Sequence, residues 1–319
     1  MIILFLAVAC YIAANQFYKQ TNDFKRKNFS FFRFKTVPKK LKMVNFGTTN
    51  ALFAFNSYKE LGLRGYNFSM QTESFEGDSL LLKHFTPNIA HDAIVCFTLA
   101  PCVGFYRNKM LPHELDYYLI TGQGVENTRI KYCINKLLPL FPFKIKRGLH
   151  IIKDSNPIND ILDLESITID EKNAMKRMAD MIVAWKNLFN LSSLEQTELG
   201  EDNIRNLNDN LFLLKKMVLN SKEHLWQPII VITPFSKYLN KYISNNFIDV
   251  SIGHMINEIT KEMKVPIFDY RTDAEFQDNL SLFLDGGFRL SKKGSEIFMK
   301  KLCYDITSRG IIANNSTLS

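Results

Sequence analysis

Short apolar runs that alternate with helical patterns constrain most strongly how this chain can fold. The clearest is Ile229-Ile230-Val231-Ile232-Thr233, which has the continuous apolar character of a strand buried on both faces of a parallel sheet. Other strands are predicted at 42–46, 66–69, 93–99 and 265–270. Helices are predicted at 51–61, 74–85, 170–190, 208–222 and 249–263. The alternation predicts the α/β class, a three-layer α/β/α sandwich with a central, mostly parallel sheet.

The amino-acid composition limits the kinds of molecule that this chain is expected to bind. Of the 319 residues 46% are apolar and 23% are charged, which describes a globular core and not a disordered chain. A formal charge of +8 favours contact with anionic material such as a phospholipid surface, a nucleic acid or an acidic glycan. No zinc-finger spacing, RNA-binding aromatic signature or Walker-type loop is found, and the five cysteines have no metal-ligand spacing. We therefore expect no nucleic-acid partner, no metal and no cofactor.

The N-terminal residues indicate that the chain is attached to a membrane. Residues 1–18 contain no charged side chain, and residues 19–42 are rich in lysine and arginine. This order is typical of a membrane anchor or signal segment followed by a basic juxtamembrane linker, although a buried helix is the alternative. We predict a protein of the bacterial cell membrane with a single N-terminal anchor. Taken alone, the positive charge after the anchor would place the main domain in the cytoplasm.

The rest of the chain is predicted to form one domain at 43–306, followed by a tail at 307–319. An insertion at about 106–160 interrupts the α/β alternation, with mixed aromatic and basic residues and two prolines, Pro139 and Pro142. It is interpreted either as an amphipathic segment near the membrane or as a solvated helical excursion.

A candidate site lies where the first predicted strand meets the first helix. The turn Gly47-Thr48-Thr49-Asn50 offers two hydroxyl groups and an amide at a strand end. Backbone N–H groups at the start of a helix can stabilise an anion beside such a hydroxyl. The alternative is an ordinary turn of an α/β protein.

Gly47-Thr48-Thr49-Asn50, followed by an apolar helix, resembles the first block of the SGNH, or GDSL-like, hydrolase and acyltransferase superfamily. The resemblance implies a flavodoxin-like α/β/α fold, with Thr49 at the nucleophile position and Gly47, Thr48 and Asn50 around it. Gly65, Asn67 and Ser69 resemble the second block, which contributes to the oxyanion hole. The resemblance also implies an extracytoplasmic domain that acts on an envelope polysaccharide or an acyl donor.

The last block matches only in part. Leu290-Ser291 and Gly294 follow the family pattern, but Arg289 stands at the histidine position and Asp285 lies one residue before the expected aspartate. The third block, at Ala100-Pro101-Cys102, lacks the family's asparagine. Arginine remains protonated and cannot act as a base, and a hydroxyl without a base is a poor nucleophile.

Three interpretations remain open from the sequence. The first is O-acyl transfer or ester hydrolysis by Thr49, with Asp285 as a carboxylate partner and a base brought from His91 or His254. The second is a non-catalytic SGNH-like protein that binds a glycan or a partner in polysaccharide biosynthesis or export. The third is a membrane-tethered α/β domain with an anion site formed by the Gly47 turn and Arg289.

Overall fold

The computed structural model describes residues 2–71, 74–106, 114–123, 130, 134, 138–141, 144–153, 169–195 and 198–311. The chain forms two compact units. Unit 1 comprises Met1–Val37 and His113–Asp163, and unit 2 comprises Pro38–Pro112 and Leu164–Ser319. Much of the predicted insertion, including 107–113 and 154–160, and residues 312–319 of the predicted tail lie outside the described residues.

A five-stranded parallel sheet forms the centre of unit 2. Its strands are β1 (Leu41–Phe46), β2 (Gly65–Asn67), β3 (Ile89–Leu99), β4 (Gln227–Ile232) and β5 (Ile267–Asp269). Their order is β2-β1-β3-β4-β5, and every pair is parallel. This is the order of a flavodoxin-like doubly wound sheet, whose direction of winding reverses between β1 and β3. The predicted parallel α/β architecture is confirmed.

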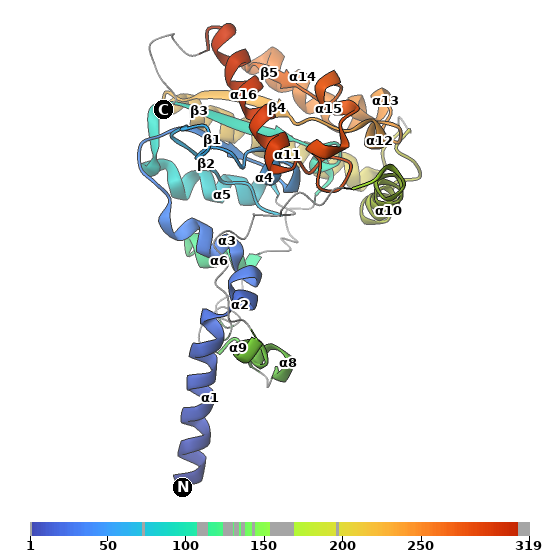
Figure 1. Cartoon of the computed structure of the whole chain (residues 1–319). Helices are drawn as coiled ribbons and strands as arrows, with labels where there is room; N and C mark the ends of the chain where they lie inside the picture. The colour runs from blue at the N-terminus through green and yellow to red at the C-terminus, as the bar shows by residue number, and fades with distance from the viewer. Residues whose placement is uncertain are drawn as a thin grey trace. The chain divides into compact units, whose positions relative to one another are not determined.

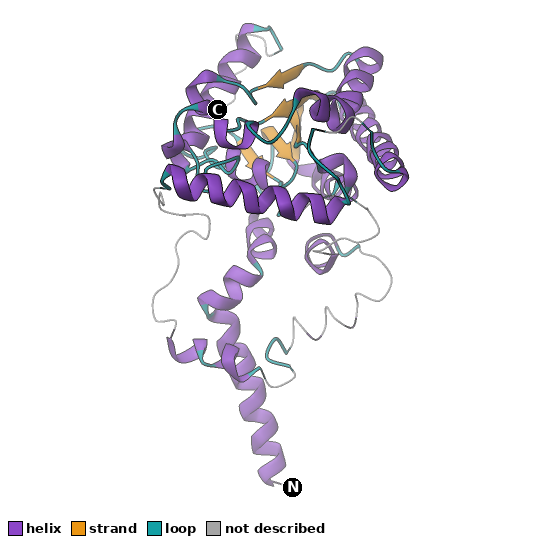
Figure 2. Ribbon diagram, turned by 90° about the vertical axis from the view of Figure 1, so that its right-hand side faces the viewer, coloured by secondary structure: helices purple, strands orange, loops and turns teal. Residues whose placement is uncertain are grey.

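Helices cover both faces of this sheet (Figures 1 and 2). The helices of unit 2 are α4 (Thr49–Ala54), α5 (Phe75–Phe85), α10 (Glu171–Phe189), α11 (Glu201–Glu223), α12 (Lys237–Asn240), α13 (Asn245–Ile248), α14 (His254–Met263), α15 (Ala274–Gln277) and α16 (Lys292–Ser308). On one face, Phe55 after α4 and Phe298 of α16 pack with Met43 and Ile229 of the sheet in a buried cluster. On the other face Phe46 stacks on Phe68, which in turn packs against Phe85 of α5.

Two predicted helix boundaries are wrong. The helix predicted for 51–61 ends at Ala54, because the Asn67 amide donates to the carbonyl oxygens of Leu52 and Phe55 at 2.9 and 3.2 Å. The helix predicted for 208–222 begins earlier, at Glu201 of α11. Of the residues added at its start, Glu201, Asp202 and Arg205 are exposed, whereas Asn203 and Leu207 are buried.

The turn between β1 and α4 depends on glycine. Gly47 has φ +142°, a backbone conformation that residues other than glycine rarely adopt. A β-carbon at this position would lie 3.0 Å from both the β-carbon and the carbonyl oxygen of Thr98, and 3.1 Å from the β-carbon of Ala51. The absence of a side chain therefore lets α4 begin directly against the end of β3.

Unit 1 consists of helices and turns among its described residues. They are α1 (Ile2–Gln20), α2 (Asn22–Lys27), α3 (Phe29–Arg33), a 3-10 turn (Phe34–Thr36), α6 (Glu114–Thr121), α8 (Ile145–Gly148) and α9 (His150–Lys153). The buried Asn15 of α1 accepts a hydrogen bond from the Leu140 N–H at 2.9 Å, which joins the two segments of the unit. Among the described residues, no helix has both the length and the apolar character needed to cross a bilayer. The anchor at residues 1–18 stays a prediction.

We expect Gly47→Ala to lower the free energy of unfolding by about 1–3 kcal/mol, because alanine is strained at this φ and its methyl group meets Thr98. Urea denaturation measures the change. Gly253→Ala is the control, since Gly253 has φ −60° and its nearest neighbour would lie 3.4 Å from a new β-carbon. An equal effect in both variants would contradict a special role for the Gly47 turn.

Candidate ligand-binding site

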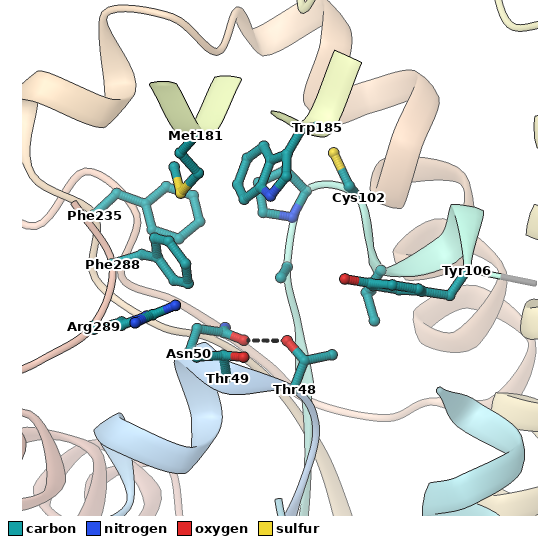
Figure 3. Close-up of a pocket in the computed structure, with 13 residues that line it drawn as sticks. Thr48, Thr49, Asn50, Cys102, Tyr106, Met181, Trp185, Phe235, Phe288 and Arg289 are labelled. Atoms are coloured by element: carbon teal, nitrogen blue, oxygen red, sulfur yellow. Dashed lines mark hydrogen bonds between the residues drawn. The ribbon is translucent and has the colours of Figure 1, made fainter. Parts of the chain in front are cut away.

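A pocket of about 160 Å³ opens in unit 2 at the carboxyl ends of the central strands (Figure 3). Thr48, Thr49 and Asn50 follow β1, residues 100–103 and Tyr106 follow β3, and Phe235 follows β4. Met181 and Trp185 come from α10, and Phe288 and Arg289 come from the turn before α16. The pocket therefore lies at the reversal point between β1 and β3, where open α/β sheets bind their ligands.

Polar side chains form one side of the pocket and are fixed by each other. The Thr48 hydroxyl lies 2.9 Å from Asn50 Oδ1, to which it donates, and Asn50 Nδ2 donates to Thr233 Oγ1 at 3.1 Å. Asn50 is almost fully buried, and Thr48 is 8% exposed. This chain of hydrogen bonds joins the turn after β1 to the end of β4, so that Thr48 and Thr49 are held at the pocket surface.

Arg289 is positioned by a turn built around Asp285. One carboxylate oxygen, Oδ1, accepts hydrogen bonds from the backbone N–H groups of Gly287, Phe288 and Arg289 at 2.9–3.1 Å. The other, Oδ2, lies 3.6 Å from Arg289 Nε. Asp285 is thus largely buried and is not among the lining residues, whereas the Arg289 side chain is 45% exposed and lines the pocket. Asp285 acts on the pocket through Arg289 and the turn.

Two glycines of the same turn allow α10 to form the aromatic wall. A β-carbon on Gly286 would lie 2.5 Å from the β-carbon of Ala174, and one on Gly287 would lie 2.1 Å from the Met178 sulfur. Because α10 lies directly on the turn, the Trp185 and Phe288 rings come within 6.0 Å of each other, measured between centroids. Trp185 and Phe288 thereby line the pocket together.

The lining residues do not include an evident base. Burial raises the pKa of the Tyr106 phenol to about 12 and raises the pKa of the Cys102 thiol well above its ordinary value, so both stay protonated near neutral pH. Arg289 is protonated under all conditions. No histidine is among the described residues that line the pocket.

Neither of the two distant bases considered from the sequence lines the pocket. His91 is the third residue of β3, at the opposite end of that strand from the pocket. His254 is exposed at the start of α14. His113 lies outside the described residues. Within the part of the chain that the structure describes, no group of three or more histidine, cysteine or acidic side chains could hold a metal.

The structure brings together only part of the predicted site. Thr48, Thr49, Asn50 and Arg289 line one pocket. The Gly47 N–H is directed to Asp78 Oδ1, 3.2 Å away, and not into the pocket.

The residues of the predicted second block, Gly65, Asn67 and Ser69, stabilise the interior of unit 2 and do not contribute to the pocket. Asn67 Oδ1 and the Ser69 hydroxyl accept from Asn45 Nδ2 at 2.8 and 2.7 Å, inside the unit. Gly65 lets the Tyr58 ring approach, because a β-carbon there would lie 2.2 Å from it. None of these three residues lines the pocket.

Sequence reasoning missed the aromatic part of the site. The residues concerned are the aromatic Tyr106, Trp185, Phe235 and Phe288, together with the neighbouring Met181. Trp185 lies four residues after Met181, which places both on one side of α10, but apolar residues at this spacing usually indicate contact with a core. Phe235 follows the strongest predicted strand, so it is the aromatic pocket residue that the sequence could most readily have indicated.

The chain matches neither a protein-family model nor a curated protein. Among solved structures it is similar to a Bacteroides fragilis protein described as a "putative acylhydrolase", at 10% sequence identity and a TM-score of 0.42, over 90% of this chain and 97% of the other. This similarity is too low to assign a family or an activity. The function is therefore argued from the pocket.

The pH dependence of stability tests the environment of Asp285. Burial raises the pKa of its carboxyl group, although the three N–H donors and Arg289 act in the opposite direction. Below the unfolded-state pKa of about 3.9 the group is protonated in both states and its relative stabilisation is fully present. As the pH rises towards the raised folded pKa, the unfolded state loses its proton first and stability is lost.

We expect the free energy of unfolding of the wild type to fall relative to Asp285→Asn between about pH 4 and pH 7, because asparagine keeps an acceptor oxygen and does not titrate. Urea denaturation at several pH values measures the difference. Asp285→Ala removes the acceptor and should be less stable than Asp285→Asn by about 1–3 kcal/mol at every pH. Parallel wild-type and Asp285→Asn profiles would show that the carboxyl pKa is not raised.

Proposed function

We propose that unit 2 is a non-catalytic, glycan-binding domain whose pocket holds one acidic sugar ring of an envelope polysaccharide. The observation that carries the proposal is the position of Arg289 beside Thr48 and Thr49, in a pocket whose described lining residues offer no base. This favours the second of the three interpretations of the sequence, and it includes the anion contact of the third.

The size and the walls of the pocket support a single ring as ligand. Its volume of about 160 Å³ is close to the roughly 150 Å³ of an engineered apolar cavity that binds benzene. The apolar face of a sugar ring can pack against Trp185 and Phe288, while its hydroxyl groups bond to Thr48 and Thr49. A pocket with rings on one side and hydroxyls on the other therefore suits a saccharide better than a purely apolar ligand.

The charge of the pocket supports an acidic substituent. Arg289 is a lining residue with a planar set of donors, which suits a carboxylate better than a neutral hydroxyl. Asp285 is already engaged by three N–H groups, so it neutralises Arg289 only through one contact of 3.6 Å. The guanidinium consequently keeps donors available towards the pocket, where its side chain is 45% exposed.

O-acyl transfer or ester hydrolysis by Thr49 is the second candidate function, because Thr49 does line the pocket. It requires a base, and a positioned base typically contributes about 10²–10⁴-fold to the rate. The lining residues of the described chain provide only the protonated Tyr106, Cys102 and Arg289. This candidate is the weaker of the two for that reason.

Replacing Arg289 tests the acidic ligand. We expect Arg289→Gln to weaken binding of an oligoglucuronate about 10–100-fold, because a hydrogen bond to a charged group contributes about 1.5–3 kcal/mol. Binding of the matched neutral oligoglucose should be much weaker and should not change. Isothermal titration calorimetry measures both, with Arg64→Gln as the control at an exposed arginine outside the pocket. Equal loss for the neutral and the acidic sugar would contradict a carboxylate contact.

Replacing Thr49 separates binding from catalysis. We expect Thr49→Ala to reduce oligoglucuronate binding by no more than about tenfold, since it removes one neutral hydrogen bond of about 0.5–1.5 kcal/mol. Acetate release from an O-acetylated glycan should be at background level for both proteins. Release by the wild type that disappears in Thr49→Ala would replace the binding proposal with ester hydrolysis or transfer.

A further inference from the structure

A second pocket lies entirely within unit 1 and has a different chemistry. It has a volume of about 340 Å³, within the range of about 300–1,000 Å³ typical of small-molecule sites. Its walls are mainly the half-buried rings of Phe24, Phe31 and Phe32 together with Leu119 of α6, and Asn28 adds one polar side chain. These largely apolar walls come from both sequence segments of the unit. A pocket of this kind suits a hydrocarbon chain.

Two lysines at this pocket provide a site for an anion. Lys19 from the end of α1 and Lys35 from the 3-10 turn both line it. Lys35 Nζ lies 4.7 Å from the ring centroids of both Phe31 and Phe32, so its charge is directed over the aromatic walls. An ammonium group binds phosphate oxygens as a point charge without requiring a fixed geometry. Apolar walls with cationic groups beside them match an amphiphile with an anionic head.

The same unit carries apolar side chains that are exposed among its described residues. Along α1, Ile2, Ile3 and Phe5 are 76%, 83% and 73% exposed, and Leu6, Val8 and Ile12 are also exposed. Exposed apolar groups gathered on one element mark a contact surface for protein or membrane. Basic residues that follow such an element are attracted to anionic lipids. A bilayer therefore explains α1 and the pocket together, whereas a dissolved fatty acid would explain only the pocket.

We propose that unit 1 binds an anionic bilayer phospholipid, with one acyl chain among Phe24, Phe31 and Leu119 and the phosphate at Lys19 and Lys35. The site is independent of the glycan pocket in unit 2, so either proposal can fail without the other. It gives the membrane contact expected from the sequence a specific lipid and a specific position.

Vesicle sedimentation with the full-length protein tests the proposal. We expect binding to phosphatidylcholine vesicles that contain one-third phosphatidylglycerol, and weak binding to phosphatidylcholine alone. Lys19→Gln/Lys35→Gln should weaken binding to the anionic vesicles about 100-fold, because each lysine loses a charge-assisted contact with the phosphate that contributes at least about a tenfold factor. A lysine outside the pocket contributes only the diffuse attraction to the surface, about a fivefold factor. The matched control is Lys25→Gln/Lys146→Gln, which removes the same charge from unit 1 outside the pocket.

Equal losses in the two double variants would show diffuse electrostatic attraction and overturn the pocket. A phosphatidylglycerol with a photoreactive acyl chain provides a second readout that does not depend on charge. Its cross-links should map to residues 24–32 and 119 and should fall at least tenfold in Leu119→Trp, which fills the pocket. Cross-links confined to residues 2–12 would overturn the proposal, as would tight binding of a dansylated fatty acid in the absence of vesicle binding.

Discussion

The parallel pairing of β1 with β3 is the constraint on which unit 2 depends. It places the end of β1 next to the end of β3, although more than 40 residues of chain separate Phe46 from Phe97, its partner in the register. The chain leaves β1 in one direction and β3 in the other, which opens a space above the two strand ends. Gly47 then allows α4 to begin against Thr98, so that Thr48, Thr49 and Asn50 border this space.

Sequence reasoning was sufficient for the sheet and for the polar part of the site. The apolar run 229–232 identifies a buried strand because it is short, consists of β-branched residues and lies between Pro228 and Pro234. The end of α4 was not predictable, since it depends on the Asn67 amide, which belongs to a strand 13 residues beyond Ala54. The aromatic wall was not predictable either, because it follows from the contact of Gly286 and Gly287 with α10, and pattern alone does not identify which helix lies on which turn.

Asp285 lies one residue before the position expected for the motif aspartate, and its contacts differ from those of a catalytic carboxylate. A carboxylate that orients a histidine would direct one oxygen towards that base. Here Oδ1 accepts three backbone N–H groups and Oδ2 lies beside Arg289. The same carboxylate therefore holds a cation at the pocket and organises the turn that carries it. The resemblance to a catalytic block and the absence of an evident base among the described lining residues are compatible for this reason.

The hydroxyl groups and part of the aromatic wall of the pocket come from different chain segments, which determines how such a site can change. Its hydroxyl groups belong to the turn after β1, whereas Met181 and Trp185 belong to α10, which contacts the rest through Ala174 and Met178. One residue inserted between Met178 and Trp185 would rotate the indole by about 100° around the helix axis and leave every hydrogen bond of Thr48 and Asn50 in place. The shape of the accepted ring and the groups that bond to it are thus encoded separately, and a change in one segment can alter one while retaining the other.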